Sequence, residues 1–536
     1  MTASATGGAA VTLTAGPVQS VDWAALGPPA IVAALGLVLL VTDLFLPERR
    51  KPLLGWAAVA GLGLALLALL PLVGADRSTF CLTTDPELCS YTADGFALAV
   101  QLLVLGGTLL TALLSLPTVA DSRLPAGEYW FLLLTSAAGA ALLPAARDLA
   151  TLVIALEVAS LPVFALIALR RGDRLGSEAA LKFFLSSVAA TAVTLLGVSF
   201  VYAATGGLHF GAVADGLRTV DAELAVLAPA GVVLTLVGFA FKTAAVPYHF
   251  WVPETYVGAP VPVAAYLSVT GKAAGFSGLV LVTVYAFPAY ATTWGPALAV
   301  LAALTMTAGN AGALRQRPEA PHSAVRLLAW SSVAQAGYLL VPIASAAYAA
   351  DAGRAVGATV TYALMYAVVN LGAFAVVLHL ARAAGDGRLT AFRGLYAAQP
   401  LAALALAFFL LCLAGLPPGV IGLFAKVTVF AAAVDAGLGW LAAVMAVNVV
   451  IGLVYYLRWT ALLFRAPATG PEAAPADTAA AAAPAGTAAG TVTGRAPSRL
   501  RPATPLGVAI AVTAVLGLVL SGAPQLVLRF ASGSLL

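Results

Sequence analysis

Runs of about 20 apolar residues recur along the whole chain, and they constrain its fold more than any other feature. Such a run is long enough to cross the hydrocarbon core of a membrane as one α-helix. The 536 residues are 61% hydrophobic and only 9% charged, with a mean hydropathy of +0.99, whereas soluble proteins carry roughly 25% charged residues. This composition excludes a soluble enzyme, a nucleic-acid-binding protein and a disordered chain. The runs do not alternate with a period of two residues, so transmembrane β-strands are excluded as well.

The sequence therefore predicts an all-α integral membrane protein with about fourteen transmembrane helices. Span seven ends at Pro247, and span twelve is interrupted by Gly415-Leu416-Pro417-Pro418-Gly419, so we expect both to be discontinuous helices. The similar strings Gly238-Phe239-Ala240-Phe241-Lys242 and Gly422-Leu423-Phe424-Ala425-Lys426 lie in these two spans, which hints at two inverted five-helix repeats, spans 4–8 and 9–13. The predicted spans cover residues 28–46, 53–74, 95–117, 128–146, 148–169, 178–204, 226–246, 259–286, 295–314, 324–345, 355–382, 400–433, 438–464 and 505–528.

The spans divide the chain into segments with different roles. Residues 466–503 are rich in Ala, Pro, Gly and Thr, which is typical of a flexible linker. The predicted organisation is an N-terminal segment (1–27), helices 1–3 (28–117), a first antiporter-like repeat (128–286), a second repeat (295–464), the linker (466–503) and helix 14 (505–528).

Basic residues set the predicted orientation. One set of alternate loops holds most of the arginines together with Lys51, and the other set holds few. Because basic loops stay in the cytoplasm, we expect the linker inside and both termini outside. Cys81 and Cys89 share an outside loop under this orientation, where they form either a disulfide or two free thiols. The three cysteines of the chain are too few for an iron–sulfur or zinc cluster.

Ionisable residues inside the apolar spans are the main functional signal. Only five of the 27 basic residues are lysines, and four of these lie within predicted spans: Lys182, Lys242, Lys272 and Lys426. Glu157 also lies in the middle of a span. Each such group costs about 2.5 to 3.5 kcal/mol at the membrane centre. Lysine gives up its proton readily when desolvated, whereas arginine does not, so the set indicates a proton relay.

A structural interpretation stays open at each of these positions. Lys182 has Glu178 four residues before it, so it fits an interfacial lysine in a helix salt bridge. Lys242 lies close enough to Pro247 to extend toward the membrane surface.

Further polar residues in spans ten and eleven fit a water chain between Lys272 and Lys426, or simple interhelical hydrogen bonding. They are Ser331, Ser332, Gln335, Tyr362, Tyr366, Asn370 and His379.

The residues resemble those of a known family, the antiporter-like subunits of respiratory complex I. The string from Phe241-Lys242-Thr243 through Pro247-Tyr248-His249-Phe250-Trp251 to Glu254-Thr255-Tyr256 is similar to the family signature. Its continuation, Gly258-Ala259-Pro260-Val261-Pro262 to Lys272, resembles the N subunit. Further matching stretches surround Glu157, Lys182, Ser331-Ser332 and Lys426, and the resemblance covers about residues 95–465.

The resemblance implies a proton channel in the membrane arm of NADH:quinone oxidoreductase, in a bacterial plasma membrane. It implies that Glu157 and Lys242 are a charge-modulating pair, that Lys272 is the central relay residue and that Lys426 is the exit-side lysine. Lys182 corresponds to the sixth-helix lysine, and His249 lies in the signature as a supporting polar residue. This subunit would carry no cofactor, since NADH, FMN, iron–sulfur clusters and quinone belong to partner subunits.

Two alternatives remain at this level. One is a subunit of a multisubunit Na⁺/H⁺ antiporter, which uses the same helices without redox chemistry. The other is a non-pumping membrane scaffold, against which the cost of the buried lysines weighs.

Overall fold

The computed structural model describes residues 21–83, 85–385, 387–466 and 503–532. Within them, twelve helical segments are long and apolar enough to cross a membrane, and the shorter apolar helices α8 (Leu227–Lys242) and α16 (Pro400–Ala414) stand at the predicted discontinuous spans. The all-α membrane fold is thus confirmed, while the count of fourteen and the inverted repeats stay predictions. Residues 1–20 of the predicted N-terminal segment and residues 467–502 of the predicted linker lie outside the described residues.

The first half of the bundle follows the predicted order of spans. Its main helices are α1 (Trp23–Asp43), α2 (Pro52–Leu67), α3 (Gly95–Asp121), α4 (Ala126–Leu142), α5 (Leu149–Ala168), α6 (Arg174–Thr205), α7 (Phe210–Gly216), α8 and α9 (Trp251–Gly258). Short 3₁₀ turns lie at Glu48–Arg50, Leu70–Leu72, Leu143–Ala145 and Ala222–Leu224.

The helix expected at 259–286 follows, as one helical segment that contains two π-helical stretches. It consists of α10 (Val261–Tyr266), the π-helix η5 (Leu267–Gly271), α11 (Lys272–Val280) and the π-helix η6 (Leu281–Ala286). Wide π turns leave the regular ladder of backbone hydrogen bonds and are frequent at functional sites. The first of them ends immediately before Lys272.

The following helices match the prediction more closely until the last span. They are α12 (Ala291–Leu314), α13 (Ser323–Ala346), α14 (Ala352–Ala384), α15 (Leu395–Ala398), α16, α17 (Val420–Asp435) and α18 (Gly439–Phe464), with 3₁₀ turns at Pro288–Tyr290 and Leu389–Phe392. The span expected at 505–528 is present as α19 (Thr504–Gly522) but ends earlier, before Pro524, and a separate short helix, α20 (Gln525–Ser532), follows.

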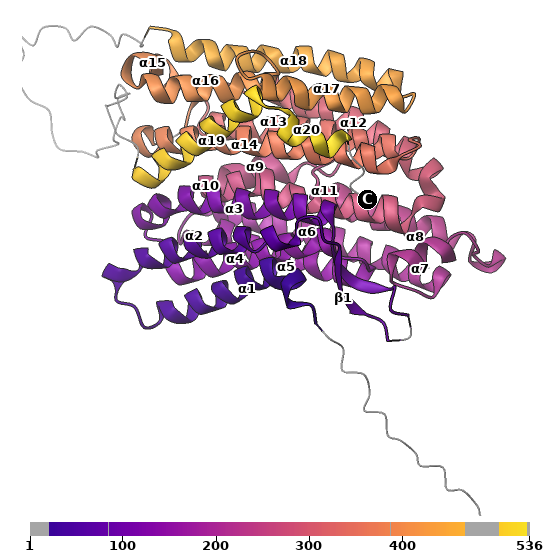
Figure 1. Cartoon of the computed structure of the whole chain (residues 1–536). Coiled ribbons are helices and arrows are strands. Elements are labelled where there is room, and N and C mark those ends of the chain that lie inside the picture. Colours follow the sequence, from indigo (N-terminus) through magenta and orange to yellow (C-terminus); the bar gives the residue numbers. More distant parts are fainter. Residues whose placement is uncertain (1–20, 84, 386, 467–502, 533–536) are drawn as a thin grey trace, which may run out of the picture.

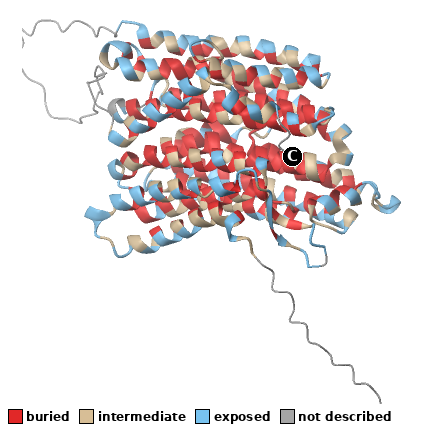
Figure 2. Ribbon diagram, in the orientation of Figure 1, coloured by how far each residue is buried: buried red, intermediate tan, exposed pale blue. Residues whose placement is uncertain are grey.

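Burial separates a central layer of helices from an outer one. The most apolar 18-residue windows of α13, of Val261–Ala286 and of α14 are 94%, 89% and 83% buried, whereas those of α6 and α19 are 28% and 22% buried. Figure 2 shows the buried residues concentrated in the middle of the bundle and the exposed ones at its ends and outer helices. The central layer is therefore where a charged side chain meets protein rather than lipid.

The two broken spans differ in where they place their lysines. Helix α8 ends at Lys242, and a turn leads to α9. Helix α16 ends at Ala414, where Gly415 adopts a φ of 84° that suits glycine, and α17 begins at Val420. Lys242 thus precedes its break and Lys426 follows its own. The two similar strings are not equivalent in position, so they do not support the repeats by themselves.

A β-hairpin that the sequence analysis did not predict covers one end of the bundle. Strands β1 (Arg77–Cys81) and β2 (Cys89–Ala93) pair antiparallel, and a disulfide joins Cys81 to Cys89. The Arg77 guanidinium contacts Asp22, the N-cap residue of α1, at 2.7 Å and holds the pKa of that carboxyl below its usual range. In Figure 1 the hairpin and the α1–α2 turn lie toward opposite ends of the bundle.

Candidate functional site

The first ionisable cluster lies where α5, α6 and the end of α8 meet. Lys242 is 6% exposed, and its ammonium donates a hydrogen bond to the hydroxyl of Ser160. The carboxylate of Glu157 accepts a hydrogen bond of 2.7 Å from Thr191. Glu157 and Lys242 line the same small cavity, together with Ser187 and Thr191 of α6. None of the ion pairs in the described part of the chain joins the two charges, so the carboxylate faces the lysine without contacting it.

Lys272 lies in the central layer, at the first residue of α11. It is 2% exposed and donates to the backbone oxygen of Ser332 at 2.5 Å and to its hydroxyl at 2.7 Å. One turn further on, Gly275 packs against Lys242, because a Cβ there would lie 3.1 Å from Lys242 Cγ. This close approach places the helices that carry Lys242 and Lys272 in direct contact.

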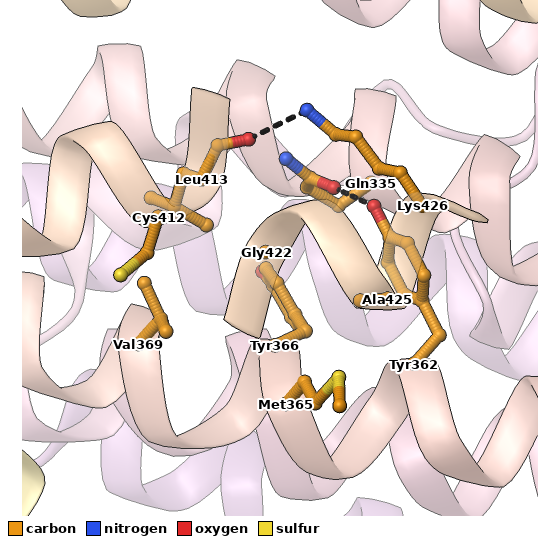
Figure 3. Close-up of a pocket in the computed structure, with 10 residues that line it drawn as sticks. All are labelled: Gln335, Tyr362, Met365, Tyr366, Val369, Cys412, Leu413, Gly422, Ala425 and Lys426. Atoms are coloured by element: carbon orange, nitrogen blue, oxygen red, sulfur yellow. Dashed lines mark hydrogen bonds between the residues drawn. The ribbon is translucent and has the colours of Figure 1, made fainter. Parts of the chain in front are cut away.

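Tyr366 of α14 connects the central lysine to the second cavity. Its hydroxyl donates a hydrogen bond of 3.0 Å to the Ser332 hydroxyl, which also accepts from Lys272. The same tyrosine lines a cavity of about 20 Å³, measured as space for the centre of a water molecule, that reaches Lys426. Figure 3 shows Tyr362, Tyr366, Gln335 and Lys426 around this cavity. A cavity of this size has room for one water molecule, and the Tyr366 hydroxyl and the Lys426 ammonium are polar groups that line it.

Lys426 closes the far side of that cavity. It is 7% exposed, and its ammonium donates to the carbonyl oxygen of Leu413 at 2.9 Å (Figure 3) and to that of Ala414 at 2.7 Å. These carbonyls end α16, where helix carbonyls lack partners within the helix and the helix dipole is negative. The break in span twelve therefore gives the lysine its site, and the lysine in turn satisfies the end of the half-helix.

Three predicted polar residues form a second branch of hydrogen bonds. Tyr362 donates to the Gln335 side-chain oxygen, while the Gln335 amide donates to Tyr456 of α18 at 3.2 Å. The hydroxyls of Ser331 and Tyr456 lie 2.5 Å apart. Tyr456 was not among the polar residues predicted from the sequence. The signal that could have found it is the tyrosine pair Tyr455-Tyr456 inside an apolar span.

Lys182 does not join the buried cluster within this chain. Its side chain is 54% exposed on the outer side of α6 and forms a 2.6 Å ion pair with Glu178. The salt bridge between residues four apart on a helix, which was left open from the sequence, is thus present, and a relay role for Lys182 stays a prediction. The neighbouring Phe183, not Lys182, contacts the buried site, with its ring centroid 5.8 Å from the Lys242 ammonium.

The two histidines of the predicted path also stand apart from the lysines. His249 lies half-buried in the turn after α8, with its ring 5.6 Å from that of Trp330. His379 is buried and contacts the side-chain oxygen of Gln399 at 2.6 Å. It follows Tyr366 by thirteen residues on α14, about 20 Å along the helix axis. The predicted polar path is therefore not one contiguous chain.

No group of His, Cys, Asp or Glu in the described residues has the arrangement of a metal site. Cys412, the free cysteine of this part of the chain, is buried in α16. The polar groups brought together are those that carry or pass a proton: ammonium, hydroxyl and amide.

Broken helices with buried lysines beside the breaks, packed around a central layer of helices, define an antiporter-like membrane protein. A family model described as NADH:quinone oxidoreductase/Mrp antiporter matches residues 146–452. The chain belongs to this family and, within it, to the NADH-quinone oxidoreductase subunit N group, as the resemblance in the sequence indicated.

Individual relatives agree with this assignment. NADH-quinone oxidoreductase subunit N 2 of Streptomyces griseus is 67% identical, covering 100% of this chain and 98% of the relative. Subunit N of Salinispora tropica is 46% identical over 96% of this chain and 99% of the relative. A chain of respiratory complex I from Thermus thermophilus with bound aureothin is 33% identical and superposes with a TM-score of 0.73, covering 94% of this chain and 100% of that one.

A likeness to the Mrp complex of Dietzia sp. DQ12-45-1b reaches a TM-score of 0.77, covering 95% of this chain and 97% of that one, but at 23% identity. It shows a shared fold alone, so the antiporter alternative has the weaker support.

Proposed function

We propose that this chain carries protons across the plasma membrane as a membrane-arm subunit of NADH:quinone oxidoreductase, driven by electron transfer in partner subunits. The subunit N relatives support this function, and the buried lysines give it a physical basis. In this proposal the chain is part of a translocating enzyme without holding a redox centre. NADH, FMN, iron–sulfur clusters and quinone are bound by partner subunits, and other membrane-arm subunits pack beside the chain in the bilayer.

The observation that carries the proposal is the connection from Lys272 through Ser332 to Tyr366 and the Lys426 cavity. Serine and tyrosine hydroxyls each donate and accept a hydrogen bond, so a proton passes along them as the bonds reverse direction. One water in the cavity completes the connection from Tyr366 to Lys426. Both end groups are lysines, which exchange protons within a protein more readily than arginines do.

Glu157 and Lys242 occupy the other end of this path. Their shared cavity lets the carboxylate approach or leave the ammonium without rearranging helices. A nearby carboxylate favours the charged lysine, and its withdrawal favours release of the proton. Since Lys242 of α8 packs against Gly275 of α11, we propose that a proton released at Lys242 passes toward Lys272, the buried lysine of the adjacent helix.

The proposal includes an orientation in the membrane. We infer from the distribution of basic loops that the linker and the α1–α2 turn face the cytoplasm, and that both termini and the disulfide-linked hairpin face outward.

The test is Lys272→Met, which keeps the length of the side chain and removes the titratable group. Proton pumping is measured in inverted membrane vesicles with NADH as donor, beside the amount of subunit in the membrane. We expect pumping to fall to background at a normal subunit level. The matched variant is Lys182→Met, which removes the exposed lysine of α6: unchanged pumping there would exclude Lys182 from the relay, and lost pumping would include it. Full pumping by Lys272→Met would favour the scaffold alternative.

A further inference from the structure

The start of α17 lacks a cap of its own. Its N-cap residue is Gly419, which has no side chain to accept a hydrogen bond from the exposed backbone amides. The amides of Val420 and Gly422 are satisfied locally, by the carbonyls of Pro418 at 3.0 Å and Gly419 at 3.2 Å. The amide of Ile421 between them has no such local partner and needs one from elsewhere in the fold.

That partner comes from α19, which follows the linker one hundred residues later. The Ile421 amide donates a hydrogen bond of 3.2 Å to the hydroxyl of Ser521. This hydroxyl donates in turn to the carbonyl of Gly517, one helical turn earlier, at 2.7 Å. The serine therefore has its single proton committed to its own helix and an oxygen lone pair directed at α17.

The same helix also contacts the other half of the broken span. Gly517 packs on the ring of Phe408 in α16, because a Cβ there would lie 2.8 Å from Phe408 Cε1. One turn of α19 thus touches both α16 and α17. The ammonium of Lys426 lies between these two half-helices, since it extends from α17 and donates to the last carbonyls of α16. Any shift of one half against the other would change those two hydrogen bonds.

The C-terminal helices also contact the cavity wall. Helix α20 packs on α14, where Thr361 donates to the backbone oxygen of Val527 at 3.2 Å. The next residue of α14 is Tyr362, which lines the Lys426 cavity. Helices α19 and α20 therefore contact α16, α17 and α14 together, and in Figure 1 they lie across these helices.

We propose that Ser521 is a positioning residue for Lys426: by capping α17 from the far side of the linker, it fixes the lysine on the carbonyl end of α16. This inference rests on the relay function proposed above. In this proposal α19, which lies outside the two predicted antiporter-like repeats, positions a lysine of the second repeat.

The test compares three variants in the assembled enzyme. Ser521→Ala removes the cap. Ser521→Thr restores a hydroxyl that is able to bond backward within the helix, as Thr513 does to Ala509 at 2.8 Å. The control, Thr513→Val, removes a buried hydroxyl of the same helix that bonds only to carbonyls of α19. Hydrogen–deuterium exchange at the start of α17 and NADH-driven pumping are both measured.

We expect faster exchange of the Ile421 amide and roughly threefold lower pumping in Ser521→Ala at a normal subunit level, because loss of a cap destabilises the start of a helix. Ser521→Thr should restore both, and Thr513→Val should change neither. Equal losses in Ser521→Ala and Thr513→Val, or faster exchange with full pumping, would overturn the proposal. Lys426→Met distinguishes failure of the relay proposal from failure of the positioning proposal. Normal pumping by Lys426→Met would contradict the relay role of this lysine. Loss of pumping in Lys426→Met together with full pumping in Ser521→Ala would contradict the positioning role alone.

Discussion

Lys272 donates two hydrogen bonds to one residue, Ser332, at 2.5 Å to its backbone oxygen and 2.7 Å to its hydroxyl. The backbone bond holds the ammonium in place, and the hydroxyl bond connects it to Tyr366. A buried charge is tolerated where such acceptors surround it. The same contacts give the proton a way to leave, because the hydroxyl that accepts from lysine is already bonded to the next hydroxyl.

Tyr366→Phe tests that connection by keeping the ring and removing the hydroxyl. We expect normal assembly and pumping reduced by about tenfold, the effect of roughly 1.4 kcal/mol, since the Ser332 hydroxyl loses its link to the cavity. Tyr338→Phe is the control, because among the described residues the Tyr338 hydroxyl takes no part in the hydrogen bonds that join Lys272, Ser332 and Tyr366, so its loss should be neutral. Proton pumping per NADH oxidised measures both, and equal activity in the two variants would contradict the route through Tyr366.

Lys426→Arg separates charge from proton release. Arginine keeps a cation beside the carbonyls of Leu413 and Ala414 but does not release a proton. We expect the subunit to assemble and pumping to be lost. Full pumping would mean that only the charge matters at this site. Lys426→Glu, by contrast, would set a carboxylate against two carbonyl oxygens, so we expect it to disturb the end of α16 and lower the subunit level, seen by immunoblot of membranes.

Glu157→Gln removes the charge next to Lys242 and keeps an oxygen that accepts from Thr191. We expect normal assembly with pumping and coupled NADH oxidation severalfold lower, because the lysine loses the charge that controls its proton. Thr191→Val is the matched variant, since it removes the hydrogen bond and leaves the carboxylate. Unchanged pumping in Glu157→Gln would exclude the carboxylate from the mechanism.

The predicted orientation is open to a chemical test. After mild reduction, a membrane-impermeant thiol reagent on intact cells should label Cys81 or Cys89, with Cys81 the more exposed of the two, because the hairpin is expected on the outside. A cysteine placed at Glu48, whose side chain is 87% exposed in the α1–α2 turn, should be labelled only in inverted vesicles. Cys412 is buried and gives no background. The reverse pattern would invert the topology and place the linker outside.

The sequence by itself determined the membrane class, most span positions and the burial of three lysines, Lys242, Lys272 and Lys426, because these depend on local composition. An apolar run of 20 residues forms a helix in a membrane whatever its neighbours are. A lysine inside such a run has few explanations other than function. The family resemblance followed from short motifs around these same residues, and the relatives confirm it.

Tertiary structure decided which polar residues act together. The sequence left open whether Lys182 pairs with Glu178 or joins the buried lysines. The packing of α6 shows that Lys182 faces outward beside Glu178, while Lys242 is buried against Ser160. His379 shares a helix with Tyr366 but lies too far along it to reach the cavity. Ser521 carries no local signal at all, because its partner Ile421 lies one hundred residues away. Contacts between distant segments depend on how helices cross, and the spacing of residues along one helix does not contain that information.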